Sequence, residues 1–192
     1  MEIKEILGLI AALLAFGSAY LYIADMLRGN TKPHTYTWLI WTIVTAIGFF
    51  GQWVSGAGAG SWATGVTALY CFIVLALSFK YGTTDITNFD KVCLALSLIS
   101  IVPWLLTQNI VLSVVLASFT DVIGFLPTMR KTWHAPKSES LGSMYFDATK
   151  HGLSILSLQS YSIATWLYPA SILVTKFAII GEILYRRRFV RE

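Results

Sequence analysis

Charged residues are scarce in this chain of 192 residues: they make up 12 % of it, whereas hydrophobic residues make up 56 %. Soluble domains carry about 25 % charged residues, and a soluble fold of this size has no means of hiding so much apolar surface. The composition therefore excludes an ordinary soluble domain and predicts that a lipid bilayer covers much of the chain. The net charge of +4 does not indicate a nucleic-acid partner.

Cysteine and catalytic motifs are also nearly absent. Cys71 and Cys93 both sit in apolar stretches, which is typical of small buried residues and not of a disulfide framework. The chain lacks a nucleophile elbow, an HExxH motif and a Cys/His cluster with metal-ligand spacing. We therefore expect neither an enzyme nor a bound metal. The N-terminal apolar run has no small-residue cleavage site, so we expect it to remain as a membrane span.

Seven apolar segments approach the roughly 20 residues that a helix needs to cross the hydrocarbon core of a bilayer. They lie near residues 6–27, 36–54, 61–79, 90–106, 110–129, 142–160 and 165–185. Short polar or glycine-rich stretches separate them, such as residues 56–60 between the second and the third. The sequence therefore predicts an all-α membrane protein with seven transmembrane helices.

Lysine and arginine gather on one side of this topology. When the N-terminus is placed outside, eleven of the fourteen basic residues fall on the inner side. They are Arg28, Lys32, Lys80, Lys91, Arg130, Lys131, Lys137, Arg186, Arg187, Arg188 and Arg191. Cytoplasmic loops of membrane proteins carry such an excess. We therefore expect a bacterial inner-membrane protein with its N-terminus outside and its C-terminus in the cytoplasm.

A polar hairpin occurs twice, at residues 28–37 and 131–140, each time between two apolar segments. An offset of 103 residues aligns the two copies and places Pro33 on Pro136. Such an internal repeat determines the architecture. It predicts two parallel three-helix units in a 3+1+3 arrangement, because units of the same orientation need an odd helix between them. The predicted parts are the first unit at 1–83, the linker helix at 84–109, and the second unit with a basic tail at 110–192.

Two further segments resemble a known family. Phe125–Thr128 contains a proline near the end of the fifth apolar segment, and Ala24-Asp25 stands at the equivalent place in the first unit. Asp147–Thr149, followed by Gly152, opens the sixth segment. With the 3+1+3 layout, these features resemble the PQ-loop/SWEET superfamily of membrane transporters, and the sixth segment is most similar to its cystinosin-type members. The resemblance implies alternating access, with Pro127 as a hinge and Asp147 as a residue associated with proton coupling.

Ionisable residues inside membrane spans are rare and usually face a cavity or a partner. The candidates in the last three predicted spans are Asp121, Asp147, Lys150, His151 and Lys176. Lys150 and His151 follow Asp147 at i+3 and i+4, so the three share one helix face. A carboxylate beside a histidine predicts a proton-responsive polar site. The alternative is a set of structural ion pairs that hold the last three helices together.

Trp38, Trp41 and Thr45 lie on one stripe of the second predicted helix. They predict an aromatic wall and a hydrogen-bonding group for a substrate, since ligand pockets combine apolar walls with few polar groups. The alternative for Trp38 is an interfacial aromatic belt, because it stands close to the start of the span. Ser18 adds a hydroxyl group from the first span.

These residues predict a transporter of a small polar or zwitterionic metabolite that works by alternating access, with protons as the candidate coupling ion and no other cofactor. The predicted partners are the lipid bilayer and a small-molecule substrate, and the sequence leaves a homo-oligomer open. Two alternatives remain at this point. One is an uncoupled facilitator of the sugar or vitamin type, and the other is a receptor or assembly factor that binds without transporting.

Overall fold

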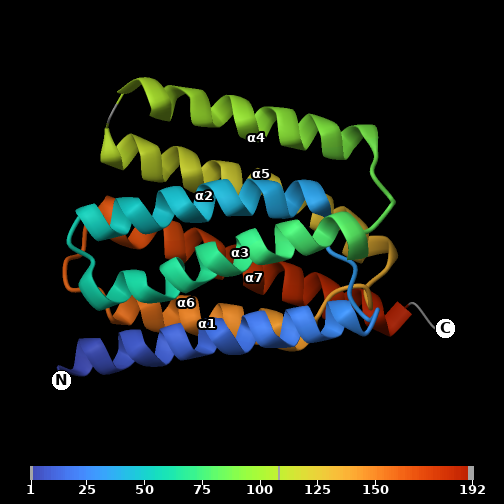
Figure 1. Cartoon of the computed structure of the whole chain (residues 1–192), viewed down its shortest axis with the longest axis horizontal. Helices are drawn as coiled ribbons and strands as arrows, with labels where there is room; N and C mark the ends of the chain where they lie inside the picture. Colours follow the sequence, from blue (N-terminus) through green and yellow to red (C-terminus); the bar gives the residue numbers. More distant parts are fainter. Residues whose placement is uncertain (1, 108, 190–192) are drawn as a thin grey trace.

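The computed structural model of the chain describes residues 2–107 and 109–189, without the side chains of residues 100–105 and 107. Within this part all the regular structure is helical, and no strand is present (Figure 1). The helices are α1 (Ile3–Leu27), α2 (Thr35–Val54), η1 (Gly58–Ser61), α3 (Trp62–Tyr81), α4 (Asn88–Thr107), α5 (Ile110–His134), α6 (Leu141–Leu156) and α7 (Ile163–Phe189). Each predicted apolar segment overlaps one of these seven α-helices.

Five of the helices are long and apolar enough to cross a membrane: α1, α2, α3 with the preceding η1, α5 and α7. The other two differ. The α6 helix has 16 residues, so it is about 24 Å long, less than the ~30 Å of a hydrocarbon core. The α4 helix carries Asp90 and Lys91 in its first turn. The all-helical class is confirmed, and the five long apolar helices agree with a membrane protein.

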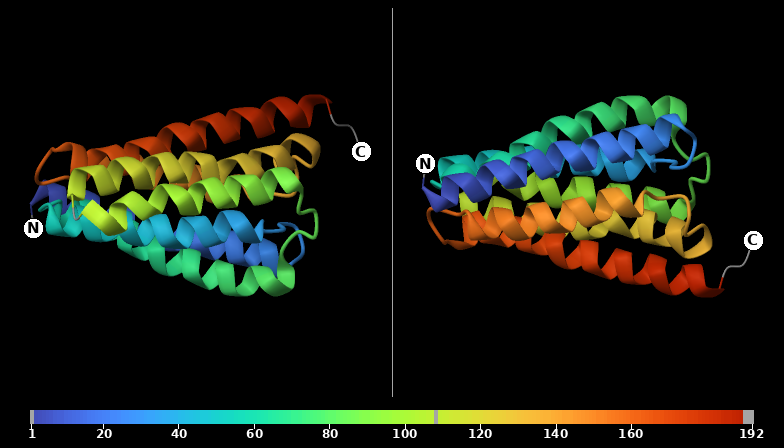
Figure 2. Two further views of the ribbon diagram at one scale, coloured as in Figure 1. Left: turned by 90° about the horizontal axis from the view of Figure 1, so that it is seen from above. Right: turned by 90° about the horizontal axis from the view of Figure 1, so that it is seen from below.

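The packing of the helices follows a regular pattern (Figures 1 and 2). The α3 helix packs against both α1 and α2, and α7 packs against both α5 and α6. These two groups meet along two seams, where α1 packs on α6 and α2 packs on α5. The α4 helix lies outside, mainly against α5. The chain begins at one end of this bundle and finishes at the other.

The α6 helix ends at Leu156, four residues before the predicted end of the sixth span. Ser157 caps it, with its amide donating to Leu153 and its hydroxyl donating to Ser154. The next residue, Leu158, is fully buried and packs on Gly60 of η1. Serine side chains that bond to the local backbone compete with helix continuation, so the span predicted at 142–160 was too long.

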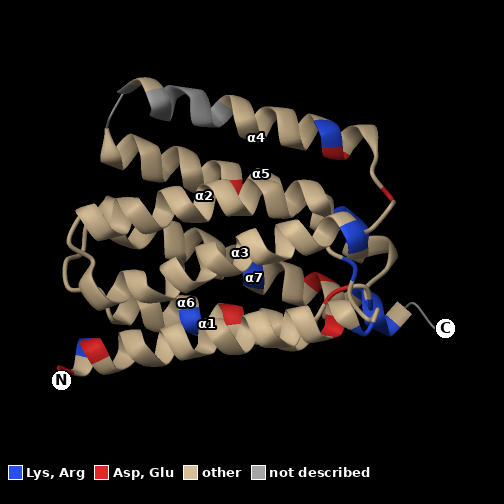
Figure 3. Cartoon of the chain, in the orientation of Figure 1, with Lys and Arg blue, Asp and Glu red and all other residues tan. Residues whose placement is uncertain are grey.

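The basic residues gather at one end of the bundle, around the ends of α3, α5 and α7 (Figure 3). At this end the two polar hairpins of the sequence contact each other. The amide of Lys32 donates to the carbonyl of Ser138 at 3.2 Å, and Lys131 Nζ donates to the carbonyl of Lys32 at 2.7 Å. The loops therefore close this end together.

Candidate functional site

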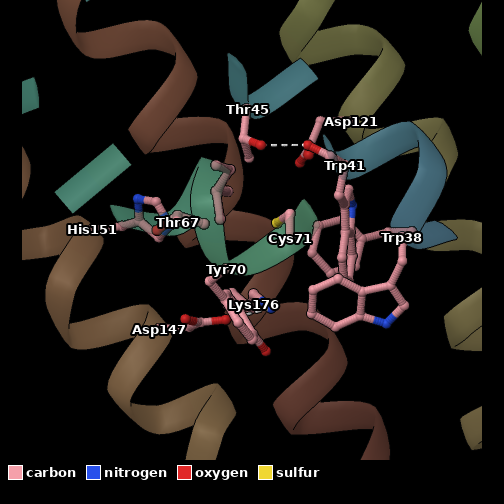
Figure 4. A pocket seen from close by; sticks show the side chains of 12 residues that line it. Trp38, Trp41, Thr45, Thr67, Tyr70, Cys71, Asp121, Asp147, His151 and Lys176 are labelled. Atoms are coloured by element: carbon pink, nitrogen blue, oxygen red, sulfur yellow. Dashed lines mark hydrogen bonds and ion pairs between the residues drawn. The ribbon is translucent and has the colours of Figure 1, made fainter. Parts of the chain in front are cut away.

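A small cavity lies in the middle of the bundle, where α2, α3, α5, α6 and α7 approach one another (Figure 4). Its volume is about 30 Å³, which is room for about one or two water molecules. The residues that line it are Trp38, Trp41, Thr45, Thr67, Tyr70, Cys71, Asp121, Phe125, Asp147, His151, Ile172 and Lys176. All of them are buried, so the cavity lies in the interior of the bundle.

Asp147 of α6 is the centre of a charged cluster on one side of the cavity. Its Oδ1 lies 2.6 Å from Lys150 Nζ, and its Oδ2 lies 2.8 Å from Lys176 Nζ of α7. Lys150 Nζ also donates to Thr67 Oγ1 of α3 at 2.8 Å. One carboxylate thus joins three helices. Buried charges persist in proteins when they are paired and hydrogen-bonded in this way.

Two serines fix the position of Asp147 from the opposite helix. Ser18 Oγ of α1 donates to Asp147 Oδ1 at 2.6 Å, and it lies 2.8 Å from Ser143 Oγ of α6. Ser143 Oγ in turn donates to the carbonyl of Ser18 at 3.0 Å. Small hydroxyl side chains let two membrane helices approach closely and bond across the contact. The seam between α1 and α6 is therefore polar at the depth of the cavity.

Aromatic rings form the adjoining wall. Trp38 and Trp41 meet edge to face, with ring centroids 5.0 Å apart, and Trp38 meets Tyr70 at 5.1 Å in the same manner. Lys176 Nζ stands 5.0 Å from the ring centroid of Trp41 and 5.1 Å from that of Phe125. An ammonium group at this distance is attracted to the ring faces. Trp38 is 3 % exposed, which places it in the interior of the bundle and not in an interfacial belt.

Asp121 of α5 is the second carboxyl group of the cavity, on the side away from Asp147 (Figure 4). It is 1 % exposed. Within the described part of the chain, no hydrogen bond or ion pair reaches its Oδ2. The indole Nε1 of Trp41 is also buried without a hydrogen-bond partner among the described residues. The nearest hydroxyl on the same wall, Thr45 Oγ1, donates to the carbonyl of Trp41 at 2.5 Å.

Polar contacts close the basic end of the bundle. Lys131 forms a buried ion pair with Glu139, and Glu139 accepts a long hydrogen bond of 3.5 Å from Tyr22 OH. Nearby, His34 is fully buried in the loop before α2. Burial lowers the pKa of His34 below its usual value, although the Asp90 carboxylate, 3.4 Å from its Nε2, opposes that shift. At the opposite end, the amide of Gln159, after α6, donates to the carbonyl of Ala57, just before η1, at 3.3 Å.

Six of the eight predicted site residues line the cavity: Trp38, Trp41, Thr45, Asp121, Asp147 and His151. The other two, Ser18 and Lys150, bond directly to Asp147. Pro127 lies away from the cavity, buried inside α5. Nowhere in the described chain do three His, Cys, Asp or Glu side chains gather as metal ligands.

Sequence reasoning missed the contribution of α3 and underrated Lys176. Thr67, Tyr70 and Cys71 line the cavity from α3. Their spacing of i, i+3 and i+4 puts them on one helix face, and the two polar members in an apolar span were the available signal. Lys176 was recognised as buried but was not included among the predicted binding residues. Its partner is on another helix, so spacing along the chain gave no indication of it.

Comparisons with protein families, with curated proteins and with solved structures gave no match.

Proposed function

We propose that this protein is a membrane transporter that moves a small zwitterionic metabolite by alternating access. The observation that carries the proposal is the buried central cavity with separated charged groups. Asp121 stands on one side of it and Lys176, paired with Asp147, on the other. A carboxylate suits an ammonium group and a lysine suits a carboxylate, so a ligand that bears both charges matches the two sides.

The size of the cavity supports a mechanism with moving parts. A volume of about 30 Å³ holds about one or two waters and is too small for a metabolite. The substrate therefore enters only when the surrounding helices separate. A receptor of this kind would have a cavity open to one side, whereas the lining residues here are buried throughout. This favours transport over the receptor alternative.

The packing pattern supports two parallel three-helix units of the PQ-loop/SWEET type. Each contact within or between α1, α2 and α3 has a counterpart when these helices are exchanged for α5, α6 and α7. The α1–α6 contact corresponds to the α5–α2 contact, and the contacts of α3 with α1 and α2 correspond to those of α7 with α5 and α6. Parallel repeats with a site at their interface near mid-membrane are a known transporter plan. In this proposal α4 is the linker helix, and the units rock against each other along the two seams.

The orientation follows from the basic end of the bundle. We place that end, with the C-terminus, in the cytoplasm and the N-terminus outside, in a bacterial inner membrane, because lysine and arginine are retained on the inner side. The arginines near the end of α7 then face the anionic inner leaflet.

Uptake by proteoliposomes tests the function. We expect accumulation of at least one labelled probe from a panel of glycine, alanine, glycine betaine and glucose, with the zwitterions ahead of glucose. Trp41→Ala should weaken the apparent affinity about thirtyfold, since a buried tryptophan at a binding site contributes ~2 kcal/mol or more. Trp53→Ala is the matched control on the same helix, because Trp53 is 59 % exposed, and it should leave uptake unchanged. Absence of uptake and of thermal stabilisation by every probe would overturn the proposal.

A further inference from the structure

We propose that Asp121, and not Asp147, is the group that takes up and releases the coupling proton. This inference rests on the proposed transport function and identifies the coupling site within it. Asp147 is then a permanently ionised anchor for the two lysines. In each cycle a proton moves from water on one side of the membrane to a carboxylate oxygen of Asp121 and leaves to water on the other side. The O–H bond is the only bond that forms and breaks.

The contacts of Asp147 keep it ionised. Three donors reach its two oxygens: Lys150 Nζ, Lys176 Nζ and Ser18 Oγ. Adding a proton would leave both lysines buried without a carboxylate, which is strongly unfavourable. His151 lines the same cavity, but its Nδ1 has no hydrogen-bond partner among the described residues. Asp147 and His151 therefore do not form the hydrogen-bonded pair that a proton relay would use.

The surroundings of Asp121 differ from those of Asp147 in the absence of a donor to its Oδ2. No donor of the described chain bonds to its Oδ2, and a buried carboxylate oxygen without a donor or a paired cation is costly. A bound proton removes that cost, and so does the approach of a cation. Asp121 can thus be stabilised either by a proton or by a cation, which suits a group that loads and unloads a proton.

The sequence explains why donors are missing there. The 103-residue offset between the two polar hairpins aligns Asp121 with Ser18, and it aligns Asp147 with Val44. The α1–α6 seam brings a serine to the carboxylate, whereas the α2–α5 seam is apolar at the same depth. Val44 and Ile40 are fully buried there, and Ile40 packs directly on Gly124, one turn from Asp121.

Lys176 is the group that can respond to the charge of Asp121. It lines the same cavity from α7 and is close enough for its charge to interact with that of Asp121. Tyr168 of α7 is also close enough to sense the charge of Asp121. The α2 helix offers Trp41 and Thr45, which do not titrate, and Cys71 and His151 line the cavity from α3 and α6. The α4 helix has its charged residues in its first turn, away from the cavity.

Lys176 already occupies an intermediate place. Its Nζ contacts Asp147 and stands over the rings of Trp41 and Phe125, and Phe125 is one helical turn from Asp121. When Asp121 loses its proton, the new negative charge draws Lys176 away from Asp147, and Lys150 with Ser18 keeps Asp147 neutralised. When Asp121 is protonated, Lys176 returns to Asp147. This exchange couples the proton to the contact between α6 and α7.

Labelling with dicyclohexylcarbodiimide, which adds to protonated carboxyl groups in apolar surroundings, tests the assignment without a substrate. The wild-type protein in liposomes is treated at a series of pH values, and mass spectrometry locates the adducts. We expect the Asp121 adduct to exceed the Asp147 adduct at least about tenfold, and to decline about tenfold per pH unit once Asp121 ionises. Equal or greater labelling of Asp147, or no labelling of Asp121 at about pH 5, overturns the inference.

Two variants separate this inference from the transport proposal. Asp121→Asn removes the titratable carboxyl group, and with it the carboxylate proposed to meet the ammonium group, so it should abolish accumulation of labelled alanine driven by a pH gradient. If the wild-type protein transports alanine and Asp121→Asn still accumulates it with the pH gradient, the inference fails alone. If the wild type moves none of the panel, the transport function fails, and infrared spectra decide the proton site. The protonated-carboxyl band should then vanish in Asp121→Asn and persist in Asp147→Asn.

Discussion

Asp147 is the carboxylate that both cavity lysines contact, so its replacement by asparagine tests the charge cluster directly. The amide cannot neutralise the lysines, and it leaves two ammonium groups in a buried site. Removing one partner of a buried ion pair costs about 3 to 5 kcal/mol, chiefly because the remaining charge is uncompensated. For a chain of this size that corresponds to a fall of about 6 to 20 °C in the unfolding midpoint.

The geometry also predicts the order of the neighbouring variants. Lys176→Met leaves Asp147 paired with Lys150 and bonded to Ser18, so it removes one charged hydrogen bond and should cost about 1 to 3 kcal/mol. The variant that combines Asp147→Asn with Lys150→Met and Lys176→Met removes all three charges. It should be more stable than Asp147→Asn alone, because apolar replacements of complete buried ion pairs are often neutral or stabilising.

Thermal unfolding in detergent, followed by tryptophan fluorescence, measures this series. The expected order of stability is wild type, then Lys176→Met, then Asp147→Asn, with the triple variant above Asp147→Asn. If Lys176→Met lost as much stability as Asp147→Asn, Asp147 would not be the shared anchor of the cluster. A triple variant less stable than Asp147→Asn would show that the lost contacts, and not the stranded charges, determine the cost.

Two further outcomes follow from the packing and from the buried loop histidine. A Cβ on Gly8 would lie 2.6 Å from the Cβ and the carbonyl oxygen of Ala59, so Gly8→Ala should cost about 1 to 3 kcal/mol by overpacking. Gly152→Ala in α6 is the control, because a Cβ there meets open space. It should be neutral or slightly stabilising in the same unfolding assay. Burial lowers the pKa of His34, so the folded state binds fewer protons than the unfolded state, whose pKa is ~6.5. The stability is therefore complete above that pH and declines as the pH falls below it. We expect His34→Gln to flatten this decline in unfolding midpoints measured across pH, and His134→Gln, at an exposed position, to leave the decline unchanged. A decline that survives in His34→Gln would show that His34 is not its cause.

The helices were predictable because each is an apolar segment bounded by polar or glycine-rich residues. Residues 28–37 and 131–140 are polar, and α1, α2 and α6 end or begin close to the predicted positions, whereas α5 continues to His134, beyond the predicted end at 129. The end of α6 was not predictable from hydropathy, because Leu158 is apolar but belongs to a loop that packs on η1. Hydropathy measures burial and not the state of the backbone, so an apolar residue beyond a helix end extends the predicted span.

The site was predictable where the partners share a helix and unpredictable where they do not. Asp147 and Lys150 are three residues apart, and their proximity follows from helical geometry alone. The contact of Lys176 with Asp147, and that of Ser18 with Asp147, join helices far apart in the sequence. A count of two carboxylates and two lysines indicates a balanced interior. It does not reveal that both lysines pair with one carboxylate and that Asp121 has neither.

The proposed repeat explains why both lysines pair with Asp147 and neither pairs with Asp121. In the first unit the residue aligned with Asp121 is Ser18, a donor that meets a carboxylate across the α1–α6 seam. In the second unit the carboxylate occupies the donor's place, and the aligned partner across the α2–α5 seam is Val44. The donor and acceptor that meet in one seam are thus aligned with an acceptor and a hydrocarbon side chain in the other. In this structure the carboxylate of the α1–α6 seam is bonded, whereas we propose that the carboxylate of the α2–α5 seam is satisfied by a proton or by a cation, so that a symmetric framework acquires two unlike halves.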